Sequence, residues 1–171
     1  MQRRLLLTLG AVGALSACGF QLRQTGDYAF KTLYANFSAT SPLGVDLRRN
    51  LLGTGRIDVW TDPKQMPQAD AILDVLSEDR QRVVVGVNAS GQVRELQLRL
   101  NVKFRLRTPQ GVEWIEPVEL AQQRDLSFTE TAALSKEIEE GMMYRDMQAD
   151  IVQQIMRRLS AVKPRGLVAK P

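Results

Sequence analysis

Hydrophobic and polar residues alternate strictly through the middle of the chain. Every even position from Leu96 to Leu106 is apolar, and the odd positions from Gln97 to Arg107 are polar. A period of two is typical of a β-strand with one face buried. At about 3.3 Å per residue, this strand is predicted to be roughly 40 Å long. Its polar face carries basic side chains, namely Arg99, Lys103, Arg105 and Arg107.

Four further segments have the composition of strands, rich in β-branched and aromatic residues. They lie at 28–37, 56–60, 72–87 and 112–128. The segment from Asp62 to Gln68 is predicted to be a loop, because its two prolines cannot continue a hydrogen-bonded ladder.

The second of two predicted hairpin turns can be tested against the alternation. We expect a three-residue loop at Pro109–Gly111, with Gly111 in the left-handed conformation. A slip of one residue would put facing apolar side chains on opposite sides of the sheet. The expected cross-strand pairs are Leu106 with Trp114, Val102 with Val118, and Leu100 with Leu120.

The first turn fits less well. Asn88–Gly91 has turn chemistry, and a four-residue loop there would place Val83 opposite Leu96. The same register would set polar residues opposite the next two leucines. A bulge near Glu78–Gln81 would resolve the mismatch, and the pattern does not place it further.

Two helices are predicted from periodicity of three and four residues. Ser41 is a suitable N-cap and Pro42 a suitable first residue, and leucines then recur every fourth position until Gly53. A second apolar stripe runs from Thr131 to Leu159. Gly141 within it costs about 1 kcal/mol relative to alanine, which leaves open whether this helix begins at Thr131 or near Gly141.

The order of elements predicts an α+β fold. We expect a two-layer sandwich in which two helices pack on one face of a largely antiparallel four- to five-stranded sheet. The other face of the sheet should be polar and basic. Residues 27–160 are predicted to form a single domain, and residues 161–171 a flexible C-terminal tail.

The N-terminus has the pattern of an export signal. Arg3 and Arg4 precede an apolar run at 5–15 that is too short to span a bilayer. Leu-Ser-Ala then precedes Cys18, which resembles the lipobox of bacterial lipoproteins. We therefore expect a signal peptide at 1–17, a lipidated cysteine at position 18 and a tether at 18–26. The alternative is an ordinary signal peptide followed by an incidental thiol.

The composition narrows the classes of function. The chain has no histidine and one cysteine, which excludes Ser-His-Asp and Cys-His nucleophiles, the usual zinc sites and an intrachain disulfide. Carboxylate pairs such as Glu137 with Glu140 read as solvated surface charges. We expect no enzymatic activity, no metal and no cofactor other than the covalent lipid. Despite a net charge of +4, an exported, anchored protein has no access to cytoplasmic nucleic acid.

The mature N-terminus and the last helix resemble one family. CGFQLR at 18–23 is similar to the start of mature LptE (RlpB) lipoproteins, although Gln21 stands where histidine is common in that family. MMYRDM at 142–147 and QQIMRRL at 153–159 resemble the family's C-terminal helix. The similarity covers the whole mature domain, but these are packing and anchoring motifs without a catalytic signature.

The resemblance implies a specific function. LptE proteins are outer-membrane lipoproteins on the periplasmic face, where they act as plug and 1:1 assembly partner of the LptD β-barrel. They bind lipopolysaccharide and help deliver it to the outer leaflet. Two alternatives remain: an activator or adaptor of a periplasmic peptidoglycan-synthesis enzyme, and a purely structural envelope lipoprotein without a ligand.

Two sets of basic residues are candidates for this function. Arg99, Lys103 and Arg105 are expected to face the barrel wall, although a solvated sheet face would look the same. In an antiparallel meander, a second set should gather at one end and suit lipopolysaccharide phosphates: Arg82, Arg94, Arg124 and Lys136. Lys136 resembles a basic residue before the family's last helix, whereas the turn at 88–91 lacks the arginine that the family can carry there. Scattered surface charges are the alternative.

Overall fold

The computed structural model describes residues 28–38, 40–127 and 133–163. The predicted signal peptide, the tether with Cys18 and most of the predicted tail lie outside these residues. The described elements, in chain order, are β1 (Thr32–Asn36), α2 (Pro42–Gly53), β2 (Asp58–Trp60), the 3-10 helix η2 (Pro63–Gln68), β3 (Ala71–Val87), β4 (Val93–Arg107), β5 (Glu113–Ser127) and α3 (Ala133–Ser160).

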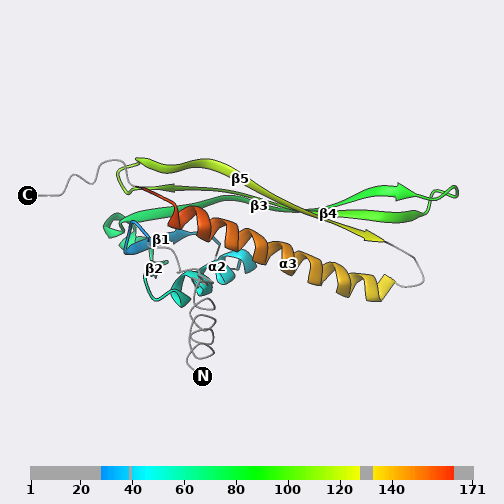
Figure 1. The fold of residues 1–171 in the computed structure, drawn as a ribbon, viewed down its shortest axis with the longest axis horizontal. Coiled ribbons are helices and arrows are strands. Elements are labelled where there is room, and N and C mark those ends of the chain that lie inside the picture. Colours follow the sequence, from blue (N-terminus) through cyan, green and yellow to red (C-terminus); the bar gives the residue numbers. More distant parts are fainter. Residues whose placement is uncertain (1–27, 39, 128–132, 164–171) are drawn as a thin grey trace, which may run out of the picture.

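The five strands form one sheet in the order β2-β1-β3-β4-β5. β1 runs parallel to both of its neighbours, whereas β3, β4 and β5 form an antiparallel meander. Figure 1 shows α2 and α3 on the same side of the sheet, with the β3–β4 hairpin reaching beyond β5. The predicted α+β sandwich, with two helices on one face of the sheet, is confirmed.

The core lies between the sheet and the helices. The apolar face of β4 is its centre, because all six even-numbered residues from Leu96 to Leu106 are at most 3 % exposed. Burying a side chain of this size stabilises a fold by roughly 1.5–3 kcal/mol. The helices complete the core with Leu43, Leu47 and Leu51 from α2 and with Met147, Ile151, Ile155 and Leu159 from α3.

Both hairpins of the meander close with three-residue loops. At the second, the Thr108 N–H donates to the Val112 carbonyl at 2.8 Å and Gly111 has φ of 90°, as predicted. The predicted four-residue first loop is wrong. The Asn88 N–H donates to the Gln92 carbonyl at 2.9 Å, and Gly91 takes the left-handed position with φ of 78°. Asn88 is therefore the last paired residue, and its side chain accepts from the Gln92 N–H.

The predicted pairing of β4 with β5 fails beyond the turn. Two register shifts lie between Phe104 and Arg107, so that Val102 pairs with Leu120 rather than with Val118. Because the two shifts add up to two residues, apolar side chains keep the predicted face. Pro117, which has no N–H to donate, lies in the irregular stretch of β5.

The bulge in β3 occurs earlier than predicted. The register shifts at Leu76, between Val75 and Ser77, two residues before the stretch near which a bulge was expected, and further irregularities flank Gly86. Beyond it, Arg80 pairs with Leu100 and Arg82 with Leu98, so these arginines share the face that the helices cover. Leu76 itself is 45 % exposed.

Three further outcomes concern the helices. Ser41 caps α2 by accepting from the Gly44 N–H, as expected. α3 continues through Gly141, which answers the open question about where this helix begins. The segment predicted as a loop at 62–68 contains η2, which starts after Asp62 as N-cap.

The face of the sheet without helices is not wholly polar. Tyr34, Ala69 and Ile72 form a second small core, with Trp60 and Met66 packed against it. Met66 belongs to η2, so this short helix contributes to the apolar cover there. The expectation of a polar face holds for the meander but not for this end of the sheet, and in the meander the basic residues of β4 lie beside acidic residues such as Asp79 and Glu119.

Candidate partner-binding surfaces

The polar face of β4 is the first candidate surface. Arg99 lies between Gln81 of β3 and Gln123 of β5, and its Nε donates to Gln97 at 2.8 Å. Lys103 is exposed and lies between Ser77 and Glu119. This surface therefore mixes charges and hydrogen-bonding groups. Basic residues on β4 are accompanied by acidic ones on its neighbours, which the sequence of β4 alone did not show.

Arg105, the third predicted member of this surface, belongs to a partly buried ion-pair cluster. Its Nε donates to Asp74 at 2.9 Å, and the Nε of Arg107 donates to the same oxygen at 2.7 Å. The Asn36 amide donates to the other oxygen at 2.9 Å. Burial raises the pKa of Asp74, but the hydrogen bonds from Arg107, Asn36 and Arg105 outweigh it and hold the pKa below its ordinary value.

The second candidate surface begins beneath α3. Arg82 and Arg124 flank Leu98 in one row across the sheet, on the helix side. Arg82 lies 3.6 Å from Glu140, and Arg124 lies 3.0 Å from Asp150. Both acids belong to α3, so these two predicted binding residues also attach the helix to the sheet.

Arg80 and Tyr144 strengthen this attachment. The guanidinium of Arg80 donates to Gln148 at 2.9 Å and lies 5.4 Å from the ring centroid of Tyr144, within the range of a cation–π contact. The Tyr144 hydroxyl donates to the Gln81 carbonyl at 2.7 Å. Burial, followed by the nearby Glu140 charge, raises the pKa of Tyr144.

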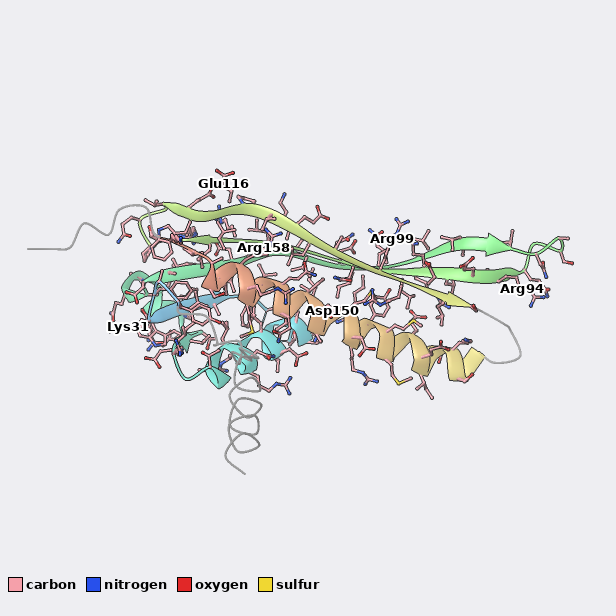
Figure 2. All side chains as sticks on the ribbon, viewed as in Figure 1. Lys31, Arg94, Arg99, Glu116, Asp150 and Arg158 are labelled. Atoms are coloured by element: carbon pink, nitrogen blue, oxygen red, sulfur yellow. The ribbon has the colours of Figure 1, made fainter. Side chains whose placement is uncertain are left out.

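The remaining two predicted binding residues differ in their surroundings. Lys136, in the first part of α3, pairs with Glu139 at 2.7 Å. Arg94 is exposed and lies near the tip of the β3–β4 hairpin (Figure 2). It makes no ion pair with any residue in the described part of the chain. Of the four predicted binding residues, Arg94 is thus the one that can bind an anion without first breaking an ion pair with a carboxylate.

The structure also contains a groove that the sequence did not reveal. It lies between the end of β1 and α2, with a volume of about 580 Å³. It arises where β2 ends before its neighbour β1 does, which the pattern of residue types does not show. Among the described residues there is no group of acidic or cysteine side chains arranged to hold a metal ion, and no helix with the length and hydropathy to cross a membrane.

Comparison with known proteins supports the resemblance to the LptE family. Residues 30–159 match the family model described as LptE, Lipopolysaccharide-assembly. The LPS-assembly lipoproteins LptE of Photorhabdus laumondii and Pectobacterium atrosepticum are 26% and 28% identical to the chain; each alignment covers 95% of the chain and 88% of the relative.

Solved structures share the fold. Lipoprotein B from Nitrosomonas europaea is 33% identical with a TM-score of 0.70, over 84% of this chain and 91% of that one. A minor lipoprotein from Acinetobacter baumannii, 24% identical over 80% of this chain and 99% of that one, has a TM-score of 0.61 and supports the fold alone. The family match spans the whole sandwich from the strand before α2 to the end of α3, and the chain belongs to the LptE family of lipopolysaccharide-assembly lipoproteins.

Proposed function

We propose that this protein is an outer-membrane lipoprotein, anchored on the periplasmic face through Cys18, that forms a 1:1 complex with the LptD β-barrel as its plug and assembly partner. In this role it binds lipopolysaccharide and helps deliver it to the outer leaflet. The proposal rests on the family match over residues 30–159.

The polar face of the meander suits the inside of a barrel. The inner walls of such barrels are polar, so a plug needs a surface that exchanges hydrogen bonds and ion pairs with them. The row of Gln81, Arg99 and Gln123 offers hydrogen-bonding groups, and the neighbouring Lys103 and Glu119 offer both signs of charge. We assign this face, including Arg105, to the barrel.

The hairpin and the start of α3 suit an anionic glycolipid. Arg94 is exposed without an acidic partner among the described residues, and Lys136, Arg82 and Arg124 hold carboxylates that phosphate groups can replace. A ligand that binds Lys136, Arg82 or Arg124 must displace the carboxylate of α3 that pairs with that residue. Raising the salt concentration should therefore weaken the contribution of Arg94 to lipopolysaccharide binding more than the contributions of the other three residues.

No step of this function requires catalysis. We propose that the protein works without enzymatic activity and without a cofactor, and that the covalent lipid on Cys18 supplies the anchor. Two or more acyl chains on one residue give stable membrane attachment.

Charge reversal tests the glycolipid site. In detergent micelles, the full-length protein with Arg94→Glu and Lys136→Glu should bind lipopolysaccharide at least tenfold more weakly at moderate salt. Arg145→Glu, an exposed position of α3 outside the site, is the matched control and should change the affinity less than twofold. Equal affinities for both variants would exclude this site.

Replacing the lipidated cysteine tests the anchor. Cells that express Cys18→Ala in place of the wild type should release the protein into the periplasmic fraction when the barrel is absent. Continued membrane fractionation under that condition would contradict anchoring through this residue.

A further inference from the structure

The groove beside α2 is built on an unfinished part of the sheet. β1 pairs with β2 only as far as Tyr34 with Trp60, but it pairs with β3 as far as Asn36 with Asp74. Beyond Trp60, the outer edge of β1 therefore has no neighbouring strand among the described residues. The groove of about 580 Å³ lies along this edge.

Part of the groove wall is apolar. Val45 and Leu52, on α2, are 54 % and 44 % exposed although both are large hydrophobic residues. Phe37 continues the apolar lining from the end of β1. Its ring packs directly over Gly44, where any Cβ would collide with it. The helix thus holds this aromatic side chain in place beside the groove.

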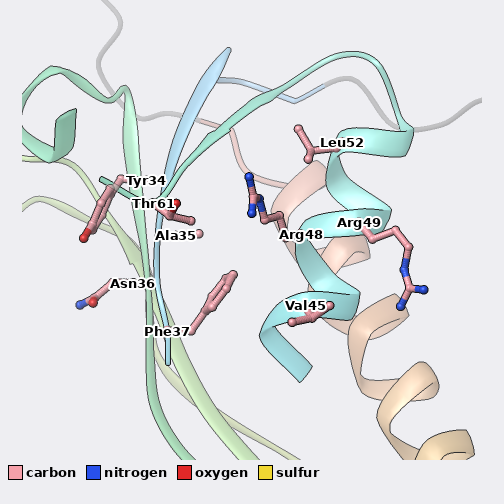
Figure 3. Close-up of a pocket in the computed structure, with 9 residues that line it drawn as sticks. All are labelled: Tyr34, Ala35, Asn36, Phe37, Val45, Arg48, Arg49, Leu52 and Thr61. Atoms are coloured by element: carbon pink, nitrogen blue, oxygen red, sulfur yellow. The ribbon is translucent and has the colours of Figure 1, made fainter. Parts of the chain in front are cut away.

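The charges of the groove have one sign. Its lining contains two arginines and no carboxylate. Arg49 pairs with Asp46 and turns to the far side of the helix, whereas Arg48 points into the gap between α2 and β1 (Figure 3). Arg48 has no ion-pair partner within the described ranges. An occupant that places a carboxylate here would complement the charge of Arg48.

We propose that this groove binds an extended, acidic segment of a partner protein, which adds as a strand to β1 at Ala35 and Asn36, where the outer edge has no neighbouring strand among the described residues. An edge strand with unpaired backbone groups is a ready template for such addition. Backbone hydrogen bonds would hold the segment, and its side chains would select the partner. The proposal does not depend on the function proposed above, because the groove shares no residue with the barrel-facing or glycolipid-binding sets.

The spacing of the lining predicts the sequence of the segment. Val45 and Leu52 are seven residues apart, or about 10.5 Å along the helix axis, and Arg48 lies between them. In a strand, residues i and i+4 are about 13 Å apart on one face. The segment should therefore place an acidic residue at the centre, with apolar residues two positions before and after it.

Binding of a synthetic peptide to the full-length protein in detergent micelles tests this proposal. The probe is a nine-residue peptide with the core Val-Thr-Asp-Thr-Val, and NMR follows the backbone amides of Ala35 and Phe37. Both signals should shift on binding. Arg48→Glu should weaken binding at least tenfold, whereas the control Arg145→Glu should change it less than twofold.

Three further probes separate strand addition from other modes of binding. A peptide with asparagine in place of the central aspartate should bind at least fivefold more weakly. A peptide with alternate backbone nitrogens methylated should bind at least tenfold more weakly, because it cannot form the ladder. The proposal is overturned if the methylated peptide binds as well as the parent peptide, or if the parent peptide does not bind. It is also overturned if the fatty acid dodecanoate, the third probe, occupies the groove and the parent peptide does not.

Discussion

At the scale of single residues, the buried polar side chains depend on hydrogen bonds from other parts of the fold. Asp74 and Gln148 are the buried polar side chains of the described residues, and each is held by partners from other elements. Asp74 receives bonds from β1 and β4, and Gln148 receives one from Arg80 and donates to Asp46. Such groups are tolerated in a core only when they are satisfied.

Replacing Asp74 with asparagine should lower the free energy of unfolding by about 2 kcal/mol. The full cost of breaking a buried ion pair is roughly 3–5 kcal/mol, and it is reduced here because Arg105 and Arg107 are partly exposed. Urea denaturation at pH 7 measures the change. Asn101→Ala, on the same face of β4, is the control and should change the stability by less than about 1 kcal/mol.

The pH dependence should follow from the same residue. The pKa of Asp74 is lower in the folded protein than in the unfolded chain, so its contribution is present above about pH 4, the ordinary pKa range of aspartate. It is lost as the pH falls through the folded-state pKa. Asp74→Asn should therefore flatten the loss of stability in acid. Parallel stability curves for the two proteins would contradict this assignment.

Two helical glycines should respond oppositely to the same substitution. Gly141→Ala should stabilise the protein by about 0.5–1 kcal/mol, because alanine favours a helix and the space around this position is open. Gly44→Ala should destabilise it by roughly 1–3 kcal/mol, since the new Cβ meets the ring of Phe37. Thermal unfolding of both variants checks the signs, and stabilisation by both would contradict the described packing.

At the scale of elements, the sequence determined the faces of strands better than their pairing. The even positions of β4 were predicted to be buried and are buried, because one face must be apolar along its whole length. The register depends on a one-residue shift at Leu76 and on two such shifts near Pro117, which leave little trace in the pattern. Arg80 and Arg82 could not be assigned to the helix side, because their face depends on the bulge at Leu76.

The glycine of the second hairpin turn should contribute to stability through its backbone conformation. Gly111→Ala should destabilise the protein by about 1–2 kcal/mol, because alanine pays that cost in the left-handed conformation. Gly111→Asn should cost less, since asparagine tolerates this conformation. Gly53→Ala, which has open space and no positive φ, is the control. Equal costs at positions 53 and 111 would contradict the turn geometry.

At the scale of the whole molecule, the sequence predicted the class of fold and the family correctly, whereas its assignment of binding surfaces stays a prediction. Residue types and alternation indicated which basic residues are candidates for binding. Their ion pairs with acids of α3 could not be predicted, because they depend on how the helix crosses the sheet. The groove beside β1 was missed for the same reason: it arises where a three-residue strand stops before its neighbour does.

The central claim is that this protein fits a β-barrel partner of the outer membrane. Affinity purification of the chromosomally tagged protein from detergent-solubilised envelopes, followed by native mass spectrometry, tests it most directly. We expect a single 1:1 complex with LptD, and we expect charge reversal at Arg99 and Lys103 together to reduce its yield at least tenfold. Recovery of the wild-type protein without any β-barrel would contradict the account.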